Sequence, residues 1–365
     1  MRCGYTTGSC VTAGVKACLL AFNGEYPNNV IIKSPQDADI EVPIFSVIKT
    51  ENGYKAIVIK DAGDDPDITN GIEIITEVKV KENSHNGLKI IAGEGVGIVT
   101  KPGLEILPGE PAINKGPRIM IEKAVAEFIN TDTIFCEIIV SIPKGKELAK
   151  KTLNPILGIQ NGLSIIGTSG VVRPMSEEAF KNSLSPQISV AKALGAETIV
   201  LVPGKIGQDI AIEKYKFDPK LVIQTSNFIG HMLECTVKNN IKNVIVLGHL
   251  GKLVKMASGI FHTHNRIADA RLETLAAYLA LLGANQDLIR AILNCTTTEA
   301  AIPLIENAKL NEVYNILAQR ISLRAERYTF GELKVGSIIV TLKGDLLGYD
   351  EQAQVLGRSL GCKIK

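Results

Sequence analysis

The sequence predicts two domains: an N-terminal mixed-sheet α+β domain (residues 1–194) and a C-terminal α/β domain (residues 195–365) with a small, about four-stranded parallel sheet. Three observations lead to this fold class. The 365 residues exceed the length at which a single hydrophobic core usually stops growing. Short β-prone runs separated by Gly, Pro, Asn and Asp clusters dominate the first half. Aliphatic runs that alternate with helical stretches follow Gly195, and this alternation is typical of a parallel sheet.

The first half opens with a helix and continues mostly in strands. Thr7 or Ser9 is a suitable N-cap for a helix that ends near Gly24. β-prone runs follow at residues 30–33, 40–44, 54–59, 72–79, 88–91 and 98–100. The α+β pattern is completed by a helix over 118–129, a strand over 137–142 and a helix over 176–194.

In the second half, predicted strands and helices alternate along the chain. The strands of the parallel sheet are expected at residues 197–202, 221–225, 243–247 and 337–342. Several helices separate the third strand from the fourth. One of them carries a leucine stripe at spacings of three and four, which indicates core packing: Leu272, Leu275, Leu279 and Leu282.

Charge and cysteine usage exclude several classes of protein. The chain has 40 basic and 38 acidic residues, so its net charge of +2 favours neither nucleic acid nor an anionic membrane as the main partner. Its seven cysteines are dispersed and form no C-x-x-C pair, which fits neither a disulfide framework nor a thiolate metal site. The N-terminus lacks the apolar core of a signal peptide, and we find no apolar run of about 18 residues. We expect a cytoplasmic protein.

Three glycine-rich loops follow the first three predicted parallel strands, at residues 203–207, 226–230 and 248–252. Ligands of open parallel sheets bind at the carboxyl ends of the strands, and a helix is expected after each loop. The spacing of glycines before Lys252 does not match a phosphate-binding Walker loop, and no G-x-G-x-x-G fingerprint stands at these positions. The pattern favours a nucleoside without a phosphate chain.

Four of the five histidines fall in the second half: His231, His249, His262 and His264. A metal site is one interpretation, and Asp269 lies nearby in the sequence. However, the chain has no H-E-x-x-H pattern, and two rings spaced like those of His262 and His264 face the same way only on a strand. Histidine as a hydrogen-bond donor or proton carrier is the favoured interpretation.

The first half contains three segments with ligand-binding potential. An acidic turn, residues 60–67, either hydrogen-bonds to itself as a solvated turn or lines a substrate cleft. A glycine-rich loop at 93–103 carries one cation. The segment 154–176 is an aliphatic run interrupted by glycines, so it is either a tight loop around a buried strand or a ligand-lining loop. Seven cations are candidate partners for carboxylates of a ligand: Lys101, Arg118, Arg173, Lys252, Lys255, Arg266 and Arg271.

The chain resembles the cobalt-precorrin-5B C1-methyltransferase family (CbiD) of anaerobic cobalamin biosynthesis. An ordered set of motifs carries the resemblance: GYTTGSC (4–10), KDAGDDPDIT (60–69), GVGIVTKPGL (95–104), GEPAIN (109–114), LNPILGI and LSIIGTSGVVRPMS (153–176), GHLGKLVKMASG and THNRIADAR (248–271). The resemblance implies methyl transfer from S-adenosyl-L-methionine to C1 of a cobalt macrocycle, which gives cobalt-precorrin-6A and S-adenosyl-L-homocysteine. The cobalt arrives inside the substrate, so no protein-bound metal is expected.

With this resemblance, the C-terminal domain is expected to bind the donor through Gly204, Gly207, Ser226, Asn227, Gly248, Gly251 and Lys252. The N-terminal domain is expected to bind the macrocycle through Thr6, Thr7, Ser9, Asp64, Asp65, Lys101, Arg118, Gly167, Thr168, Ser169 and Arg173. For the two threonines and Ser9, simple helix capping is the alternative. His249 or His264 is expected to manage protons on the macrocycle.

Two rival functions remain open at this point. One is a metal-dependent hydrolase that uses His249, His262 and His264. The other is a tetrapyrrole-binding protein without catalytic activity. The methyltransferase interpretation also allows transient contacts with neighbouring pathway enzymes.

Overall fold

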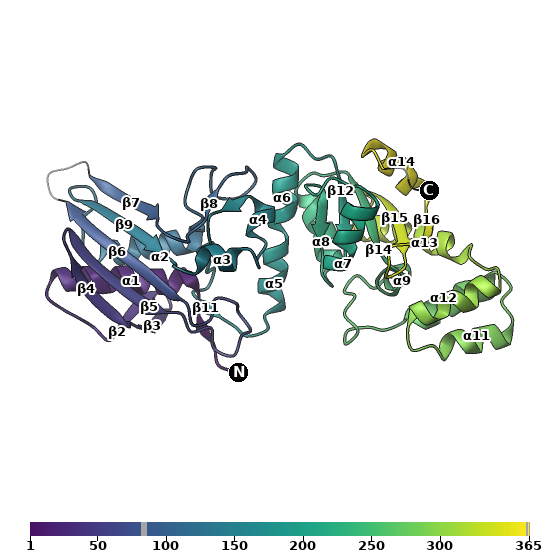
Figure 1. Ribbon diagram of the computed structural model, residues 1–365, viewed down its shortest axis with the longest axis horizontal. Helices are drawn as coiled ribbons and strands as arrows, with labels where there is room; N and C mark the ends of the chain where they lie inside the picture. Colours follow the sequence, from purple (N-terminus) through teal and green to yellow (C-terminus); the bar gives the residue numbers. More distant parts are fainter. Residues whose placement is uncertain (82–85, 363, 365) are drawn as a thin grey trace. The chain divides into compact units, whose positions relative to one another are not determined.

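The computed structural model describes residues 1–81, 86–362 and 364 (Figure 1). Two compact units, Met1–Glu177 and Glu178–Lys365, divide the chain. This division comes earlier than the expected boundary between residues 194 and 195, because the helix α6 (Pro186–Ala193) is bonded to the second unit. Its Gln187 accepts a hydrogen bond from the backbone N–H of Gln224 through Oε1 (3.2 Å).

A five-stranded mixed sheet forms the centre of the first unit. Its spatial order is β4 (Ser46–Thr50), β5 (Gly53–Ile59), β6 (Glu73–Lys81), β9 (Phe135–Ser141) and β7 (Gly87–Ala92). In the described part of this sheet, β7 and β9 run parallel to each other, and the other neighbouring strands are antiparallel. On β9, Cys136, Ile138 and Val140 are fully buried and alternate with partly exposed residues, so this strand presents one face to the core.

The buried face of this sheet packs against α1 (Thr7–Phe22), beside which lies α2 (Lys115–Ala126). Thr6 is the N-cap of α1 and accepts a hydrogen bond from the backbone N–H of Ser9 (3.1 Å), so the cap lies one residue before the earlier of the two predicted caps. The strands β2 (Asn29–Lys33) and β3 (Asp39–Pro43) form a separate antiparallel pair.

The glycine-rich segment 154–176 runs through the first unit and joins its distant parts. After α3 (Gly145–Ala149) and α4 (Asn154–Leu157), β10 (Ile159–Gln160) pairs with β8 (Ile98–Val99), and β11 (Val171–Val172) pairs with β1 (Gly4–Tyr5). Between them, Leu163 bridges to Val96. Gly162 allows this approach: a Cβ there would lie 2.0 Å from the carbonyl oxygen of Gly95. The segment therefore makes several successive pairings rather than one loop around one strand.

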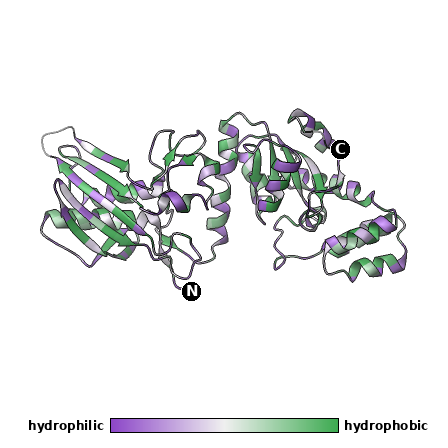
Figure 2. Ribbon diagram, viewed as in Figure 1, coloured by the Kyte–Doolittle hydropathy of each residue, from purple (hydrophilic) through white to green (hydrophobic). Residues whose placement is uncertain are grey.

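The second unit contains the predicted parallel sheet. β13 (Val222–Gln224), β12 (Thr198–Val202), β14 (Asn243–His249) and β15 (Lys334–Val340) lie in that order and are parallel, and β16 (Leu346–Tyr349) adds an antiparallel edge. Every residue of β12 is buried, as expected for a strand covered on both faces. Figure 2 shows the corresponding hydrophobic colouring of the strands.

Helices surround this sheet. Three helices lie near the carboxyl ends of the first three strands: α7 (Lys205–Asp209), α8 (Ile229–Lys238) and α9 (Leu250–Ala257). The π-helix η1 (Ile210–Lys214) directly follows α7. The four helices between β14 and β15 that follow α9 are α10 (Arg271–Leu281), α11 (Gln286–Leu293), α12 (Thr298–Asn307) and α13 (Val313–Tyr328), and α14 (Glu351–Ser359) closes the chain. Among the described residues, no helix has the length and hydropathy needed to cross a membrane.

Two of the differences from the sequence-based expectations have a clear physical basis. The helix expected over residues 176–194 is broken into α5 (Glu177–Leu184) and α6, because Pro186 cannot continue a helix and instead begins a new one. The edge strand β4 was not predicted. Its residues are all partly or fully exposed and show no alternation, so the period-2 pattern of a half-buried strand is absent, although Val47, Ile48 and Thr50 are β-branched.

Candidate functional site

The three predicted βα loops contact one another at the carboxyl edge of the parallel sheet. A Cβ on Gly248 would lie 2.8 Å from Cγ of Pro203, so the third loop touches the first. Gln224 donates through Nε2 to Oε1 of Gln208 (2.8 Å), which joins the second strand end to α7. The Lys252 ammonium donates to Oδ1 of Asn227 and joins the second loop to the third. The three loops therefore lie next to one another at this edge, where Gly207, Gly248 and Gly251 are buried.

The backbone of these loops needs small residues at several predicted positions. Gly204 has φ +105°, which a residue with a Cβ rarely adopts, and Ser226 also has a positive φ of +52°. A Cβ on Gly207 would lie 3.2 Å from the Val202 side chain, and one on Gly251 would lie 2.9 Å from Oγ1 of Thr298. These glycines therefore permit close packing at the ends of β12 and β14.

Three cations gather beside the third loop. Burial lowers the pKa of Lys252, and the positive charges of Lys255 and Arg271 lower it further. Burial also lowers the pKa of Lys255. One acidic side chain offsets this charge, because both carboxylate oxygens of Asp269 accept from Arg271 at 2.6 and 2.8 Å. Neighbouring cations that repel one another favour an anionic ligand at this place.

Lys255 is fully buried and acts as a tether. Its ammonium donates three hydrogen bonds, to Oδ1 of Asn265 (2.7 Å) and to the carbonyl oxygens of Ala268 (2.8 Å) and Thr263 (3.1 Å). All three donor positions of the ammonium are thus used. The side chain fixes the segment 263–268, which contains the candidate residue His264, against α9.

His249 ends β14 and is the N-cap residue of α9. Burial, together with the positive charges of Lys252 and Arg271, lowers the pKa of His249 to about 4. The imidazole is therefore neutral near pH 7, where it has one N–H donor and one acceptor nitrogen.

The stability of the second unit is expected to depend on pH through His249. An unfolded imidazole has a pKa of about 6.5, so between that value and about 4 the unfolded chain binds a proton that the folded chain does not. The free energy of unfolding therefore falls as the pH drops through this window, and the full contribution is present above it. Urea unfolding of the wild type and of His249→Gln, compared at about pH 4.5 and about pH 7.5, measures this contribution. Between about pH 7.5 and about pH 4.5, the free energy of unfolding should fall less in His249→Gln than in the wild type. An identical fall in both proteins would contradict the lowered pKa of His249.

The other histidines occupy different surroundings. His264 is exposed, and its Nδ1 accepts from the backbone N–H of Arg266 (3.2 Å). Its ring centroid lies 6.5 Å from that of His262. Within the described part of the chain, no three His, Cys, Asp or Glu side chains are grouped as metal ligands. The structure therefore does not assemble His249, His262 and His264 as the hydrolase interpretation requires.

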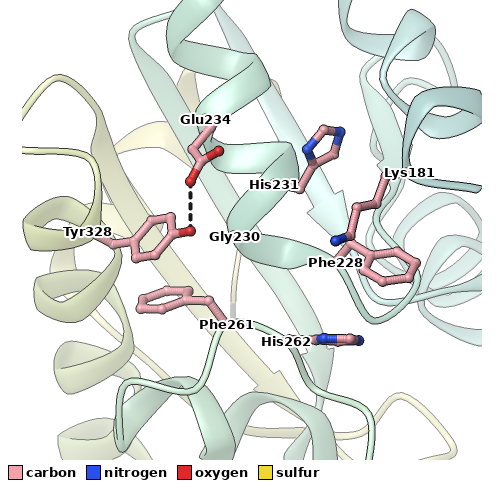
Figure 3. A pocket seen from close by; sticks show the side chains of 8 residues that line it. All are labelled: Lys181, Phe228, Gly230, His231, Glu234, Phe261, His262 and Tyr328. Carbon is pink, nitrogen blue, oxygen red and sulfur yellow. Dashed lines mark hydrogen bonds between the residues drawn. The ribbon is translucent and has the colours of Figure 1, made fainter. Parts of the chain in front are cut away.

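An aromatic pocket opens beside the second loop, next to these histidines (Figure 3). It has a volume of about 250 Å³ and is lined by Lys181, Phe228, Gly230, His231, Glu234, Phe261, His262 and Tyr328. The loop 226–230, His231 and His262 stand out in the sequence, whereas the pocket itself does not. Tyr328 and Glu234 lie 94 residues apart in the chain, and no local pattern connects them.

In the first unit, the predicted hydroxyl residues fasten α1 to the glycine-rich segment. Ser9 donates through Oγ to the carbonyl oxygen of Gly170. Thr7 donates through Oγ1 to the carbonyl of Ile166 (3.2 Å) and accepts from its N–H (2.9 Å). Thr6, Thr7 and Ser9 are all at least nine-tenths buried. In this structure they cap the helix and bind the neighbouring backbone.

The remaining small residues of the segment lie at the same place. A Cβ on Gly167 would be 2.4 Å from Oγ1 of Thr6. The carbonyl oxygen of Thr168 accepts from the side-chain amide of Gln36 (2.9 Å), and Ser169 donates through Oγ to the carbonyl of Val171 (3.0 Å). The structure thus brings the segment 167–170 next to Thr6 at the N-terminus of α1.

The acidic turn uses its carboxylates to hold backbone and cations. Asp64 accepts from the backbone N–H of Arg2, and Asp65 accepts from that of Met175 (2.9 Å). Burial alone would raise the pKa of Asp67, but hydrogen bonds from Lys60 and Thr69 bring it below its ordinary value. Asp67 therefore bonds to Lys60 within the turn, whereas Asp64 and Asp65 bind the backbone of segments outside it.

The three predicted cations of the first unit differ in the bonds that their side chains make within the protein. Lys101 donates to the carbonyl oxygen of Ile156 (3.3 Å). Arg118 donates to the carbonyl of Ile113 (2.9 Å) and pairs with Glu110 (3.3 Å). Arg173 is exposed directly after β11.

Family models and curated proteins match this chain over most of its length. The model described as CbiD matches residues 1–174, and the model described as the CbiD C-terminal domain matches residues 262–351. The chain belongs to the CbiD family. The second match begins at His262, so it includes the segment 263–268 that Lys255 tethers.

Among the CbiD relatives, a cobalt-precorrin-5B C(1)-methyltransferase from Moorella thermoacetica is 47% identical over 98% of this chain and 97% of that protein. A protein of the same name from Methanocaldococcus jannaschii is 46% identical over 94% of this chain and 95% of its own length. The crystal structure of a cobalamin biosynthesis protein (cbiD) from Archaeoglobus fulgidus is 27% identical, covers 73% of this chain and 83% of that chain, and has a TM-score of 0.38.

Proposed function

We propose that this chain transfers a methyl group from S-adenosyl-L-methionine to C1 of cobalt-precorrin-5B, in the anaerobic pathway to cobalamin. The products are cobalt-precorrin-6A and S-adenosyl-L-homocysteine. One observation carries the proposal: a protein named cobalt-precorrin-5B C(1)-methyltransferase is 47% identical over 98% of the chain. The enzyme would work in the cytoplasm, with transient contacts to neighbouring pathway enzymes and without nucleic acid or membrane as partners.

The chemistry of the three βα loops supports a role in holding the methyl donor. The donor has an amino-acid end with a carboxylate, which suits the ammonium of Lys252, and ribose hydroxyls, which suit an amide such as Asn227. Gly248 and Gly251 leave backbone without a side chain at the start of α9. When bound, the sulfonium supplies an activated methyl whose bond to sulfur breaks as its bond to carbon forms.

The protein's own task is then mainly positioning. Holding donor and acceptor in line removes much of the entropic barrier, and excluding water protects the reacting groups. A strong protein nucleophile is unnecessary. His249, neutral near pH 7, would act as a hydrogen-bonding group toward the macrocycle, with His264 as the second candidate.

The first unit is proposed to bind the macrocycle, and the second to bind the donor. Arg173 is the predicted cation in the first unit most open to a substrate carboxylate, since Lys101 and Arg118 already bond within the protein. The cobalt belongs to the substrate, and we propose no metal site on the protein.

Anaerobic incubation of the purified chain with cobalt-precorrin-5B and S-adenosyl-L-methionine tests this function. The expected result is a macrocycle heavier by one methyl group, with one S-adenosyl-L-homocysteine formed for each turnover. Folded protein that binds the macrocycle but leaves its mass unchanged would instead support the non-catalytic tetrapyrrole-binding function.

A further inference from the structure

The aromatic pocket in Figure 3 has two aromatic walls. The rings of Phe228 and His262 lie with centroids 4.9 Å apart and an interplanar angle of 39°. Across the pocket, Phe261 and Tyr328 lie 4.3 Å apart at 33°. Two tilted ring pairs facing one cavity of about 250 Å³ favour a flat, unsaturated ligand over a flexible one.

Gly230 lets the backbone of the first turn of α8 pack closely against the second wall, Phe261 and Tyr328. A Cβ there would lie 2.8 Å from Oη of Tyr328 and 2.9 Å from Cβ of Phe261. Because real Cβ atoms are not found so close, a side chain at this position would push the second wall away. The α8 backbone and the second wall are therefore fitted to each other.

The polar groups of the pocket are few and nearly balanced in charge. Glu234 accepts from the Tyr328 hydroxyl at 2.7 Å, and a carboxylate has further acceptor positions for a ligand N–H. Burial lowers the pKa of His231, which favours the neutral ring. Lys181 lies over the Phe228 ring with its ammonium 5.1 Å from the centroid. One carboxylate and one ammonium give no excess positive charge for a polyanion.

The pocket is continuous with the loops that the proposed function assigns to the donor. Phe228 follows Asn227 directly in the chain, and His262 directly precedes Thr263. The backbone N–H of Thr263 donates to the carbonyl of Asn227 (2.9 Å), and the Asn227 side chain accepts from Lys252. The same two backbone segments therefore border both the pocket and the candidate loops.

We propose that this pocket takes a 6-aminopurine, the adenine of the methyl donor, stacked between the two aromatic walls with its amino group donating to Glu234. The proposal rests on the proposed function for the identity of the donor. A neutral flat heterocycle with an exocyclic N–H matches the wall geometry and the acceptor together. A carboxylate-rich macrocycle edge does not, because Glu234 would repel it.

Isothermal titration of the whole chain with two ligands tests this assignment. S-adenosyl-L-homocysteine carries the 6-amino group, and S-inosyl-L-homocysteine carries a 6-oxo group that would face the Glu234 carboxylate. The wild type is expected to prefer the amino ligand by about tenfold or more, since the oxo group loses one hydrogen bond to a charged acceptor. Glu234→Gln should bring the ratio of the two affinities closer to one, because the glutamine amide can donate a hydrogen bond to the oxo group.

A second variant and a matched control separate the binding contact from a fold defect. His262→Ala removes a stacking surface and should weaken both ligands by about fivefold or more. Glu332→Gln replaces an exposed carboxylate outside the pocket and should leave both affinities unchanged. If neither Glu234→Gln nor His262→Ala changes affinity or preference, adenine binds elsewhere and this assignment is overturned while the methyltransferase function stands. If the wild type binds neither ligand, the donor itself is wrong and both proposals fall.

Discussion

Replacing Lys255 by methionine is expected to release the segment 263–268 from α9 and to lower the free energy of unfolding by about 2–4 kcal/mol. The ammonium holds two carbonyl oxygens and one side-chain amide, and methionine can bond to none of them. Trypsin cleavage after the exposed Arg266 measures the release, and urea unfolding measures the stability.

Lys238→Met is the matched control for this variant. Lys238 is an exposed lysine on α8, so the same substitution there should change stability by no more than about 0.5 kcal/mol and leave the cleavage rate at Arg266 as it was. A Lys255→Met protein that resists trypsin as well as the wild type would show that the tether does not hold the segment.

Gly162→Ala is expected to destabilise the first unit by at least about 3 kcal/mol. Its new Cβ would lie 2.0 Å from the carbonyl oxygen of Gly95, which is backbone and cannot rotate away. The glycine-rich segment must therefore separate from the chain around Val96, although Leu163 and Val96 form a bridge there. Thermal and urea unfolding of the variant measure the loss.

Gly109→Ala provides the comparison. Gly109 has φ +94°, but its Cβ would meet no heavy atom within 4 Å, so this variant isolates backbone strain from collision. We expect a loss of about 1–2 kcal/mol from the strain alone. If Gly162→Ala were no more destabilising than Gly109→Ala, the close approach of the two backbones would not contribute to stability.

The sequence predicted the order of most elements because each carries a local signal. The four aliphatic runs of the second half are confirmed as the parallel strands β12, β13, β14 and β15. From their topology alone, the meeting of three loops at one edge follows without any knowledge of distances. Pro186 marks the break in the helix before residue 194, because proline cannot continue a helix and here begins a new one.

The side-chain partners could not be predicted in the same way. Nothing near Lys255 in sequence shows that it is buried, because its acceptors lie in a loop eight to thirteen residues later. The acidic turn illustrates the same limit: Asp65 binds the backbone of Met175, 110 residues away. Motifs located these residues, whereas only tertiary packing decides whether a polar group binds the protein or is left for a ligand.

The pairing of β1 with β11 has a consequence for how the chain is made. Gly4 and Tyr5 find their strand partners only when Val171 and Val172 have been synthesised. Thr7 likewise waits for Ile166, 159 residues later. Closing so long a loop adds little entropy cost compared with a moderately shorter one. Tyr5 can already bond to Asp61 before that point, but the β1–β11 pairing and the Thr7–Ile166 contacts form only after the glycine-rich segment has been synthesised, near the end of the translation of the first unit.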